Sequence, residues 1–538
     1  MRHHSRGWLW RVAMMVTLIT LAGALLLAGC GPAEEEAEEE DTEEETADTV
    51  DRDTLTIAIG AEPESLDPVN MTSAPAATVG EHVVERLIYM EEDGSLVPML
   101  ATDWESNDEG TVWTFDIREG VEFHDGEPLN AEAVKDNLER FVDPDVGAAY
   151  AFLLGTVEEI EAVDEYTLQL SLSEPFAPIL SHLSHSFVGI VSPAQINELE
   201  PDGTFEMPVG TGPYEMEDWS RGESISLTVN EDYYGDTPQI PNIQFDFIPE
   251  SSALIVALET GEADAIMRVP PQEAERLEGN SDIEVVNQTS VRTVYIGFNN
   301  QQEPFDDPQV RRALNYAVDK QSIVDGLFEG TFTVADAPIV ESVFGHESVG
   351  PYEYDPERAQ ELLAEAGYPD GFEMTLHHPS GRYLLDETVA EAVQDMLSEV
   401  GVDATLETRE WSSYLDFTSQ PPEEAEYDAF MLGWGTVTLD ADYGLYALLH
   451  SAQWNPDGNN RGFYENERVD ELLDEARVET DTAEREEMYA EAIELIWEDA
   501  PWIFLYNQGQ INANRTYVEG LIHHPLENLS AWDAYFTE

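Results

Sequence analysis

The chain has 538 residues, enough for two or three domains, and an apolar content of 42% that is normal for a globular protein. Its 23 basic and 113 acidic residues give a net charge of −90 at pH 7, which excludes nucleic-acid binding because no basic patch could neutralise phosphates. The acids lie along the whole chain, and their mutual repulsion opposes compaction at low ionic strength. Molar salt shortens the Debye length to about 3 Å and relieves this repulsion, so the composition indicates an exported protein of a halophile.

Residues 1–29 are predicted to be a signal peptide. Three arginines precede an uncharged stretch over 12–29 that ends at Cys30, the single cysteine. The sequence LAGC at 27–30 resembles the bacterial lipobox, which implies that Cys30 is the lipidated first residue of the mature chain. An uncleaved membrane anchor is the alternative, since about 18 apolar residues just span a bilayer. Both interpretations place the body outside the cytoplasm, held to a membrane.

Residues 30–52 are predicted to carry the lipidated cysteine and an extended acidic linker. Positions 34–48 contain 11 acids among 15 residues. Such a segment buries no apolar surface and repels itself, so we expect an extended tether between membrane and body.

Beyond residue 53 the chain alternates predicted strands with predicted helices. Alternation of apolar and polar side chains predicts half-buried strands at 113–117, 166–172, 225–229 and 294–298. Capping residues and apolar periodicity predict helices that begin after Asn130, that run from Asp355-Pro356 to Gly367, and that cover 388–400, 467–478 and 481–498. This mixture of hairpin strands and β–α alternation predicts an α/β class with mixed sheets.

The sequence carries none of the common enzyme motifs, such as a nucleophile elbow, a zinc helix or a phosphate-binding loop. Two histidine pairs, at 377–378 and 523–524, could indicate a metal site. Neighbours on a strand point to opposite faces, however, and seldom chelate one ion. We therefore predict no catalytic residue, no cofactor and no metal, and expect a binding protein rather than an enzyme.

Seven motifs follow one another along the body. They are LTIAIG and ESLDP within 55–68, LVPMLATDW at 96–104, WTFDIREGVEFHDG at 113–126, GTGPY at 210–214, PFDDPQVRRAL at 304–314 and YDP at 354–356. In this order they resemble family 5 of the extracellular solute-binding proteins, the cluster C type, over about residues 53–538. The family includes dipeptide, oligopeptide, glutathione and nickel binders.

The resemblance implies a two-lobed fold like that of periplasmic binding proteins (type II, cluster C) with mixed sheets. Lobe I would comprise 53–285, with an extra subdomain at about 83–204, and the chain would return to it over 506–538. Lobe II would comprise 286–505. Ligand would be enclosed between the lobes on hinge closure, because it contacts both lobes only in the closed state.

The implied function is that of a lipid-anchored substrate-binding protein that delivers short peptides or peptide-like solutes to the permease and ATPase subunits of an ABC importer, as a monomer. Another cargo, such as a nickel chelate, a sugar or an opine, is an alternative. So is a peptide-sensing receptor or chaperone without transport. An exported hydrolase is a third possibility from a different class.

Ligand-binding positions carry over from the resemblance one by one. Arg382 and Tyr383 are expected to bind ligand, because their segment matches the one in which dipeptide binders place an arginine on the ligand carboxylate. That role suits the planar guanidinium of Arg382; a surface ion pair is the alternative. Trp411 matches an aromatic residue of the same pocket, although tryptophan usually belongs to the core. The loop at 433–442, here called the cleft loop, would line the cleft between the lobes, and Trp434, Gly435, Thr436 and Asp440 on it are expected to bind ligand. Met71 and Thr72 would face this loop from the other lobe.

The cleft loop departs from the family pattern at Val437. Peptide binders commonly carry an aspartate at that place, where it holds the amino terminus of the ligand. Asp440 and Asp442 are nearby substitutes, although family members also carry acids there for loop structure. Val437 is retained as a site residue, and the departure implies that a free α-amine is recognised differently or not at all.

Overall fold

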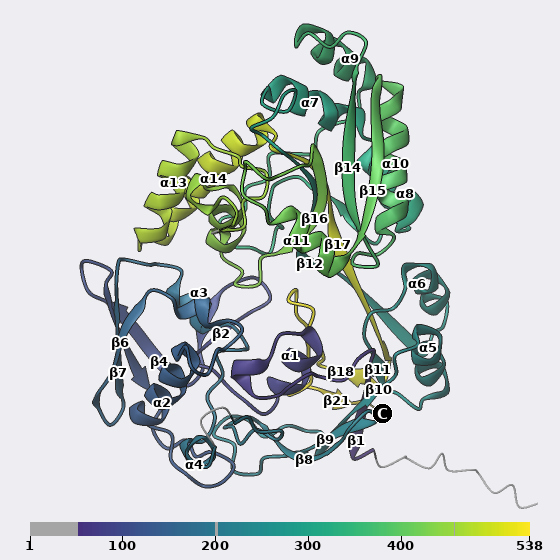
Figure 1. Cartoon of the computed structure of the whole chain (residues 1–538). Helices are drawn as coiled ribbons and strands as arrows, with labels where there is room; N and C mark the ends of the chain where they lie inside the picture. The colour runs from purple at the N-terminus through teal and green to yellow at the C-terminus, as the bar shows by residue number, and fades with distance from the viewer. Residues whose placement is uncertain (1–51, 200–202, 457, 538) are drawn as a thin grey trace, which may run out of the picture. The chain divides into compact units, whose positions relative to one another are not determined.

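The computed structural model describes residues 52–199, 203–456 and 458–537 (Figure 1). The predicted signal peptide, Cys30 and nearly all of the predicted linker lie outside the described residues. Among the described helices none has both the length and the apolar character needed to span a bilayer.

An 11-stranded mixed sheet runs through the body in the order β15-β14-β16-β12-β17-β11-β1-β10-β9-β8, and β13 also pairs with β17. In chain order its strands are β1 (Thr54–Ile59), β8 (Tyr214–Ser220), β9 (Ser224–Val229), β10 (Asn242–Phe247), β11 (Ala265–Ile266), β12 (Ile283–Phe298), β13 (Thr333–Val334), β14 (Phe372–Ser380), β15 (Val402–Glu410), β16 (Ala429–Gly435) and β17 (Trp502–Arg515). The strands β14, β15 and β16 are parallel to one another, whereas β12 pairs antiparallel with both β16 and β17.

The long strands β12 and β17 form a two-stranded ribbon that connects two groups of elements seen in Figure 1. One group contains β14, β15 and β16, and the other contains β1 and β8 to β11. One end of this ribbon pairs with β16, and the other end pairs with β11. Its register breaks between the pairs Thr289–Gly509 and Thr293–Asn507, so residues 290–292 lie opposite Gln508 alone. The ribbon is therefore irregular at the point where the chain passes from one group of elements to the other.

Alternate residues of β12 and β16 enter two different clusters of buried side chains, as expected for a sheet that is covered on both faces. Val294, Ile296 and Phe298 pack into one cluster, while Tyr295 between them packs into the other. The first cluster includes side chains of α7 (Pro308–Ala317), α8 (Lys320–Leu327), α9 (Pro356–Glu365) and α10 (Asp386–Glu399), and the second those of α13 (Glu467–Val478) and α14 (Thr482–Asp499).

A second, antiparallel sheet has the order β4-β5-β7-β6 and its own buried cluster. Its strands are β4 (Ala101–Ser106), β5 (Val112–Ile117), β6 (Val157–Asp164) and β7 (Thr167–Leu172). Phe115 and Leu168 are buried between this sheet and α2 (Ala131–Val142). The side chain of Asn130 caps α2 by accepting a hydrogen bond from the backbone N–H of Ala133 at 2.9 Å.

The other elements are short. The helices are α1 (Ala74–Gly80), α3 (Ile179–Leu183), α4 (Pro193–Asn197), α5 (Ser251–Thr260), α6 (Pro271–Glu278), α11 (Trp411–Thr418) and α12 (Ala447–Leu449). The strands are β2 (Ile88–Met90), β3 (Leu96–Pro98), β18 (Val518–Glu519), β19 (Ile522–His523), β20 (Leu529–Ser530) and β21 (Tyr535–Phe536).

The predicted mixed α/β class is confirmed, and so are the strands predicted at the positions of β5, β7, β9 and β12. The helices predicted after Asn130 and at 467–478 and 481–498 correspond to α2, α13 and α14. Two bounds were wrong: β12 begins 11 residues before the predicted start, and α10 begins at Asp386 instead of Thr388. Asp386 lies at the start of the helix, where its carboxylate accepts hydrogen bonds from the backbone N–H groups of Arg382 and Tyr383.

Candidate functional site

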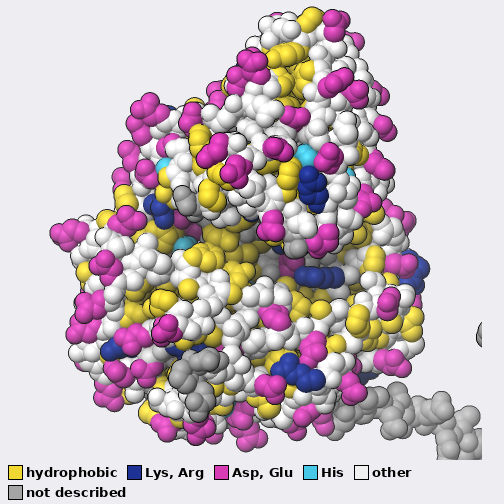
Figure 2. Space-filling model, viewed as in Figure 1, with side chains coloured by type: hydrophobic (Ala, Val, Ile, Leu, Met, Phe, Trp, Pro, Cys, Tyr) yellow, Lys and Arg dark blue, Asp and Glu magenta, His cyan; other side chains and the backbone are white. Residues whose placement is uncertain are grey.

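A cavity of about 590 Å³ lies beside the register break of β12, within the size range of small-molecule sites. One side is formed by the segment from Ala61 to α1, by 185–187 and by the turn at 526–527. The opposite side is formed by β16, α11 and loops that follow β14 and α12. Figure 2 shows the visible face hollowed between the two groups of elements, with hydrophobic and cationic side chains in the hollow and acidic ones spread around it.

The charge of the cavity lining is opposite to that of the chain. Its cations are four arginines, Arg268, Arg292, Arg382 and Arg461, and its anions are three glutamates, Glu62, Glu64 and Glu527. The whole chain has only 23 basic residues against 113 acidic ones. A surplus of cations in one cavity of so acidic a protein favours an anionic ligand.

Arg382 stands in the loop between β14 and α10. Asp386 orders this loop, since its carboxylate accepts from the backbone N–H of Arg382 at 2.9 Å and of Tyr383 at 3.2 Å. The guanidinium carbon lies 5.1 Å from the ring centroid of Trp411, within the range of a cation–π contact. Burial, and secondly the charge of Arg292, lower the pKa of Arg382. Within the described residues Arg382 forms no ion pair.

Arg461 reaches the cavity from a loop far from Arg382 in sequence. One of its amino groups, Nη1, donates to the hydroxyls of Thr418 at 3.0 Å and Ser419 at 2.5 Å. These partners are neutral, and no carboxylate in the described part of the chain lies within ion-pair distance of Arg461. Arg382 and Arg461 are therefore two cations on the same side of one cavity, and neither has an anionic partner among the residues that the structure describes.

Arg268 and Arg292 are held differently, because both contact Glu527. This glutamate lies in the turn between β19 and β20 and accepts from Arg268 Nη2 at 3.1 Å, and its other oxygen lies 3.9 Å from Arg292 Nε. Arg268 and Glu527 have φ angles of 61° and 67°, in the left-handed region that is unfavourable for residues other than glycine. Such conformations persist where surrounding contacts enforce them, and they are frequent at functional sites.

Aromatic rings form much of the remaining wall. The indole N–H of Trp434 donates to the carbonyl oxygen of Tyr443 at 3.0 Å, and the two rings lie 5.1 Å apart. Across the cavity Tyr150 stacks on His185 at 5.2 Å. Flat apolar walls with cations among them suit a ligand that has a peptide-like body and acidic ends.

The predicted site residues divide into two groups. Those that line the cavity are Thr72, Arg382, Trp411, Trp434, Gly435 and Val437. Those that do not are Met71, Tyr383, Thr436 and Asp440. Sequence reasoning missed Arg268, Arg292 and Arg461, for which the rarity of basic residues was the only available signal. It also missed Glu64 and Glu527, which nothing distinguishes from the other acids of the chain.

Each residue outside the lining has another contact. Met71 is buried against Gly80, and the backbone N–H of Thr436 donates to the carbonyl oxygen of Val291. The hydroxyl of Tyr383 accepts from the backbone N–H of Gly433 at 2.8 Å, which fixes the Arg382 loop to β16. Burial raises the pKa of this hydroxyl, and the Gly433 N–H and nearby arginines oppose that shift.

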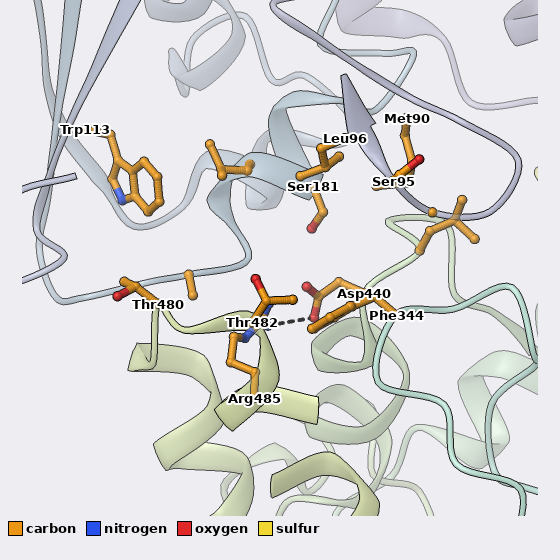
Figure 3. Close-up of a pocket in the computed structure, with 14 residues that line it drawn as sticks. Met90, Ser95, Leu96, Trp113, Ser181, Phe344, Asp440, Thr480, Thr482 and Arg485 are labelled. Carbon is orange, nitrogen blue, oxygen red and sulfur yellow. Dashed lines mark hydrogen bonds and ion pairs between the residues drawn. The ribbon is translucent and has the colours of Figure 1, made fainter. Parts of the chain in front are cut away.

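Asp440 lies in a different cavity, of about 280 Å³, where it faces Ser181 and Phe344 (Figure 3). Its carboxylate accepts from Arg485 at 3.0 Å, in a buried ion pair. This pair explains the placement of Asp440, since a buried carboxylate needs a cation or hydrogen-bond donors. In the residues that the structure describes, no group of three His, Cys, Asp or Glu side chains is arranged to hold a metal ion.

Comparison with known proteins decides the family. Residues 95–456 match the model of the bacterial extracellular solute-binding proteins, family 5. The chain belongs to this family. It is 33% identical over 484 residues to the glutathione-binding protein GsiB of Pectobacterium atrosepticum, which covers 90% of this chain and 94% of the relative. The GsiB protein of Escherichia coli K12 is 31% identical over 482 residues.

Solved structures of the family have the same fold. HbpA2 from Haemophilus parasuis superposes with a TM-score of 0.84 at 27% identity, over 90% of this chain and all of that one. The periplasmic binding protein DppA from Helicobacter pylori, solved with the peptide STSA, gives 0.73 at 29% identity, over 90% and 98% of the two chains. The predicted family and the two-lobed fold class are confirmed.

Proposed function

We propose that this solute-binding protein captures short peptides or peptide-like solutes with two carboxylates and delivers them to an ABC importer. The observation that carries the proposal is the pair Arg382 and Arg461, two cavity arginines without a carboxylate partner among the described residues. Guanidinium groups bind carboxylates in bidentate geometry, and two of them at one cavity wall accommodate two acidic groups. The relatives named as glutathione-binding support this ligand class, since glutathione carries two carboxylates.

The proposed lobes are 53–285 with 506–538, and 286–505. In this division Thr72, Tyr150 and Glu527 line the cavity from lobe I, and Arg382 and Arg461 line it from lobe II. A ligand that contacts both lobes stabilises the closed form, because those contacts are lost when the lobes separate. The register break of β12 and β17 at 290–292 is the proposed hinge. Binding and release then need no catalytic group, and we propose that the protein is not an enzyme.

The amino-terminal features extend the proposal. We propose that Cys30 is lipidated after removal of residues 1–29, and that the acidic segment to residue 52 tethers the body to the membrane. The net charge of −90 supports a saline environment for the exported protein. Intact-mass measurement of the membrane-extracted protein tests the anchor: a diacylated Cys30 is expected as the first residue, and an unprocessed amino terminus would contradict it.

Thermal unfolding of the purified body in molar salt tests the ligand class. The panel contains glutathione, a dipeptide and a tripeptide with one carboxylate each, the nickel–histidine complex and an opine. A ligand present at 100 times its Kd adds about 2.7 kcal/mol to the free energy of unfolding. We expect glutathione to raise the transition temperature most. A shift with the nickel complex or the opine alone would overturn the proposed ligand class.

A further inference from the structure

Glu527 is the carboxylate around which the cavity arginines gather. It contacts Arg268 at 3.1 Å and Arg292 at 3.9 Å, and its charge also acts on Arg382. Gln508, the residue opposite the register break, donates to the same carboxylate at 3.5 Å. The side chains of Glu527 and Arg292 are 14% and 19% exposed, so water screens their interaction less than at the open surface, whereas Arg268, at 60% exposed, remains largely solvated.

The other two cavity glutamates are engaged elsewhere. Glu62 accepts from the indole N–H of Trp219 at 2.9 Å and pairs with Arg221 at 3.5 Å. Glu64 accepts from the hydroxyls of Thr72 at 2.9 Å and Ser73 at 2.5 Å. Neither glutamate forms an ion pair with a cavity arginine in the described ranges. Glu527 is therefore the carboxylate that neutralises Arg268 and Arg292.

The arrangement has the form of a carboxylate-binding site that is already filled. Two guanidinium groups face one carboxylate, as they would face an acidic group of a ligand. The carboxylate belongs to the chain, and it is held in the turn between β19 and β20 by a backbone conformation that is unfavourable for glutamate. A third acidic group of a ligand would meet the negative charge of Glu527 at this position.

We propose that Glu527 is a specificity-determining residue, a tethered carboxylate that fills a third carboxylate site and restricts the ligand to two acidic groups. This inference rests on the proposed function, since it concerns the same cavity and ligand class. Arg382 and Arg461 are available to carboxylates of the ligand, whereas Arg268 and Arg292 already face the carboxylate of Glu527. Discrimination arises from repulsion of the wrong ligand as well as from attraction of the right one.

Two glutathione derivatives of nearly equal size test the inference. S-carboxymethyl glutathione has a third carboxylate, and S-carbamoylmethyl glutathione has a neutral amide in its place. Calorimetry in one molar-salt buffer gives the Kd of each for the wild type and for Glu527→Gln. The wild type is expected to bind the carboxymethyl derivative no more tightly than the carbamoylmethyl derivative. Glu527→Gln is expected to change the ratio of the two Kd values at least tenfold in favour of the carboxymethyl derivative.

Glu62→Gln is the matched control, because it removes the same charge from the same cavity without freeing a cavity arginine. An equal change of ratio in Glu62→Gln and Glu527→Gln would overturn the inference, and so would no change in Glu527→Gln. If Glu527→Gln does not fold, Arg268→Gln replaces it, because the side chain of Arg268 is 60% exposed and its substitution should be tolerated. In this variant the ratio of the two Kd values is expected to change in the opposite direction, against the carboxymethyl derivative. A wild type that binds neither derivative nor glutathione would instead refute the proposed function.

Discussion

The backbone N–H of Ala177 donates a hydrogen bond of 2.7 Å to the carbonyl oxygen of Arg477, the penultimate residue of α13. The guanidinium of Arg477 lies 5.1 Å from the ring of Phe176 and 3.9 Å from the ring of Tyr446, and it pairs with Asp442 at 3.0 Å. The backbone hydrogen bond and the contact with Phe176 join the proposed subdomain to the proposed lobe II without any participation of the ligand cavity, whereas Tyr446 and Asp442 hold the Arg477 side chain in place within lobe II. With the proposed lobes, we expect these two contacts between them to favour the closed form even before ligand binds.

Arg477→Ala is expected to shift the protein toward the open form. Loss of its cation–π contact with Phe176, worth about 1 kcal/mol when partly buried, predicts ligand affinity about 5-fold lower, chiefly through faster dissociation. Stopped-flow measurement of glutathione release checks this. The control is Arg468→Ala on the same helix, which pairs with Glu471 and Glu491 at the surface and should leave release unchanged. Equal release rates for both variants would show that the contact does not stabilise closure.

Removal of Arg382 or of Arg461 is expected to weaken binding of two-carboxylate ligands. A hydrogen bond to a charged group contributes about 1.5–3 kcal/mol, so Arg382→Ala and Arg461→Ala should each raise the Kd for glutathione about 10- to 150-fold. Calorimetry gives these values, and circular dichroism checks the fold. Arg358→Ala, at an exposed ion pair of α9, is the matched control. A Kd for Arg461→Ala equal to that of the control would remove Arg461 from the site.

Gly433→Ala is expected to destabilise the wall that carries Arg382. A methyl group at Gly433 would lie 2.9 Å from the ring of Tyr383 and 3.1 Å from Val294, and Tyr383 anchors the Arg382 loop. Overpacking of this kind costs about 1–3 kcal/mol, and displacement of the loop should lower affinity as well. Denaturant unfolding and calorimetry measure both effects. Gly326→Ala, where the added methyl has open space in α8, should be neutral or stabilising.

The stability of the body is expected to depend on pH through Glu85. The hydroxyls of Thr211, Tyr233 and Tyr234 donate to this carboxyl group, and burial raises its pKa from 4.5 to about 7. Between pH 4.5 and 7 the unfolded chain releases the proton while the folded protein retains it. The contribution of Glu85 to the free energy of unfolding is therefore present below pH 4.5 and is lost as pH rises to about 7.

Comparison of the wild type with Glu85→Gln isolates this contribution. Between pH 4.5 and 7 the free energy of unfolding of the wild type should fall by about 3 kcal/mol relative to that of Glu85→Gln. Denaturant unfolding at constant salt gives the two curves. Glu159→Gln, at an exposed position of β6, is the control for loss of one charge. Parallel curves for wild type and Glu85→Gln would contradict the raised pKa.

Local sequence signals predicted most of the fold. The N-cap Asn130 and the apolar periodicity of α13 are properties of neighbouring residues, and both predictions agree with the structure. The first half of β12 was missed because half of its side chains are only partly buried and do not alternate cleanly. Its strand character comes from pairing with β17, more than 200 residues later, which no local pattern contains.

The candidate site was predictable only where a motif marked it. Arg382 and Trp411 were found because they lie in segments that match the family. Arg461 was missed because Thr418 and Ser419, which orient it, lie more than 40 residues away. Asp440 was expected at the cleft, but its partner Arg485 is 45 residues later and turns it toward another cavity. Partners separated by this distance are determined by tertiary structure, which the sequence alone does not display.

The break at 290–292 has a mechanical consequence. The backbone N–H of Val291 donates to Pro525 and its carbonyl oxygen accepts from Thr436, so the break is anchored to the glutamate-bearing turn on one side and to the cleft loop on the other. Arg292 projects from this break toward Glu527. Any change in the bend of the ribbon alters the separation of these two charges. If the break is the hinge, as proposed, the Arg292–Glu527 pair couples the angle of the ribbon to the electrostatic potential of the cavity.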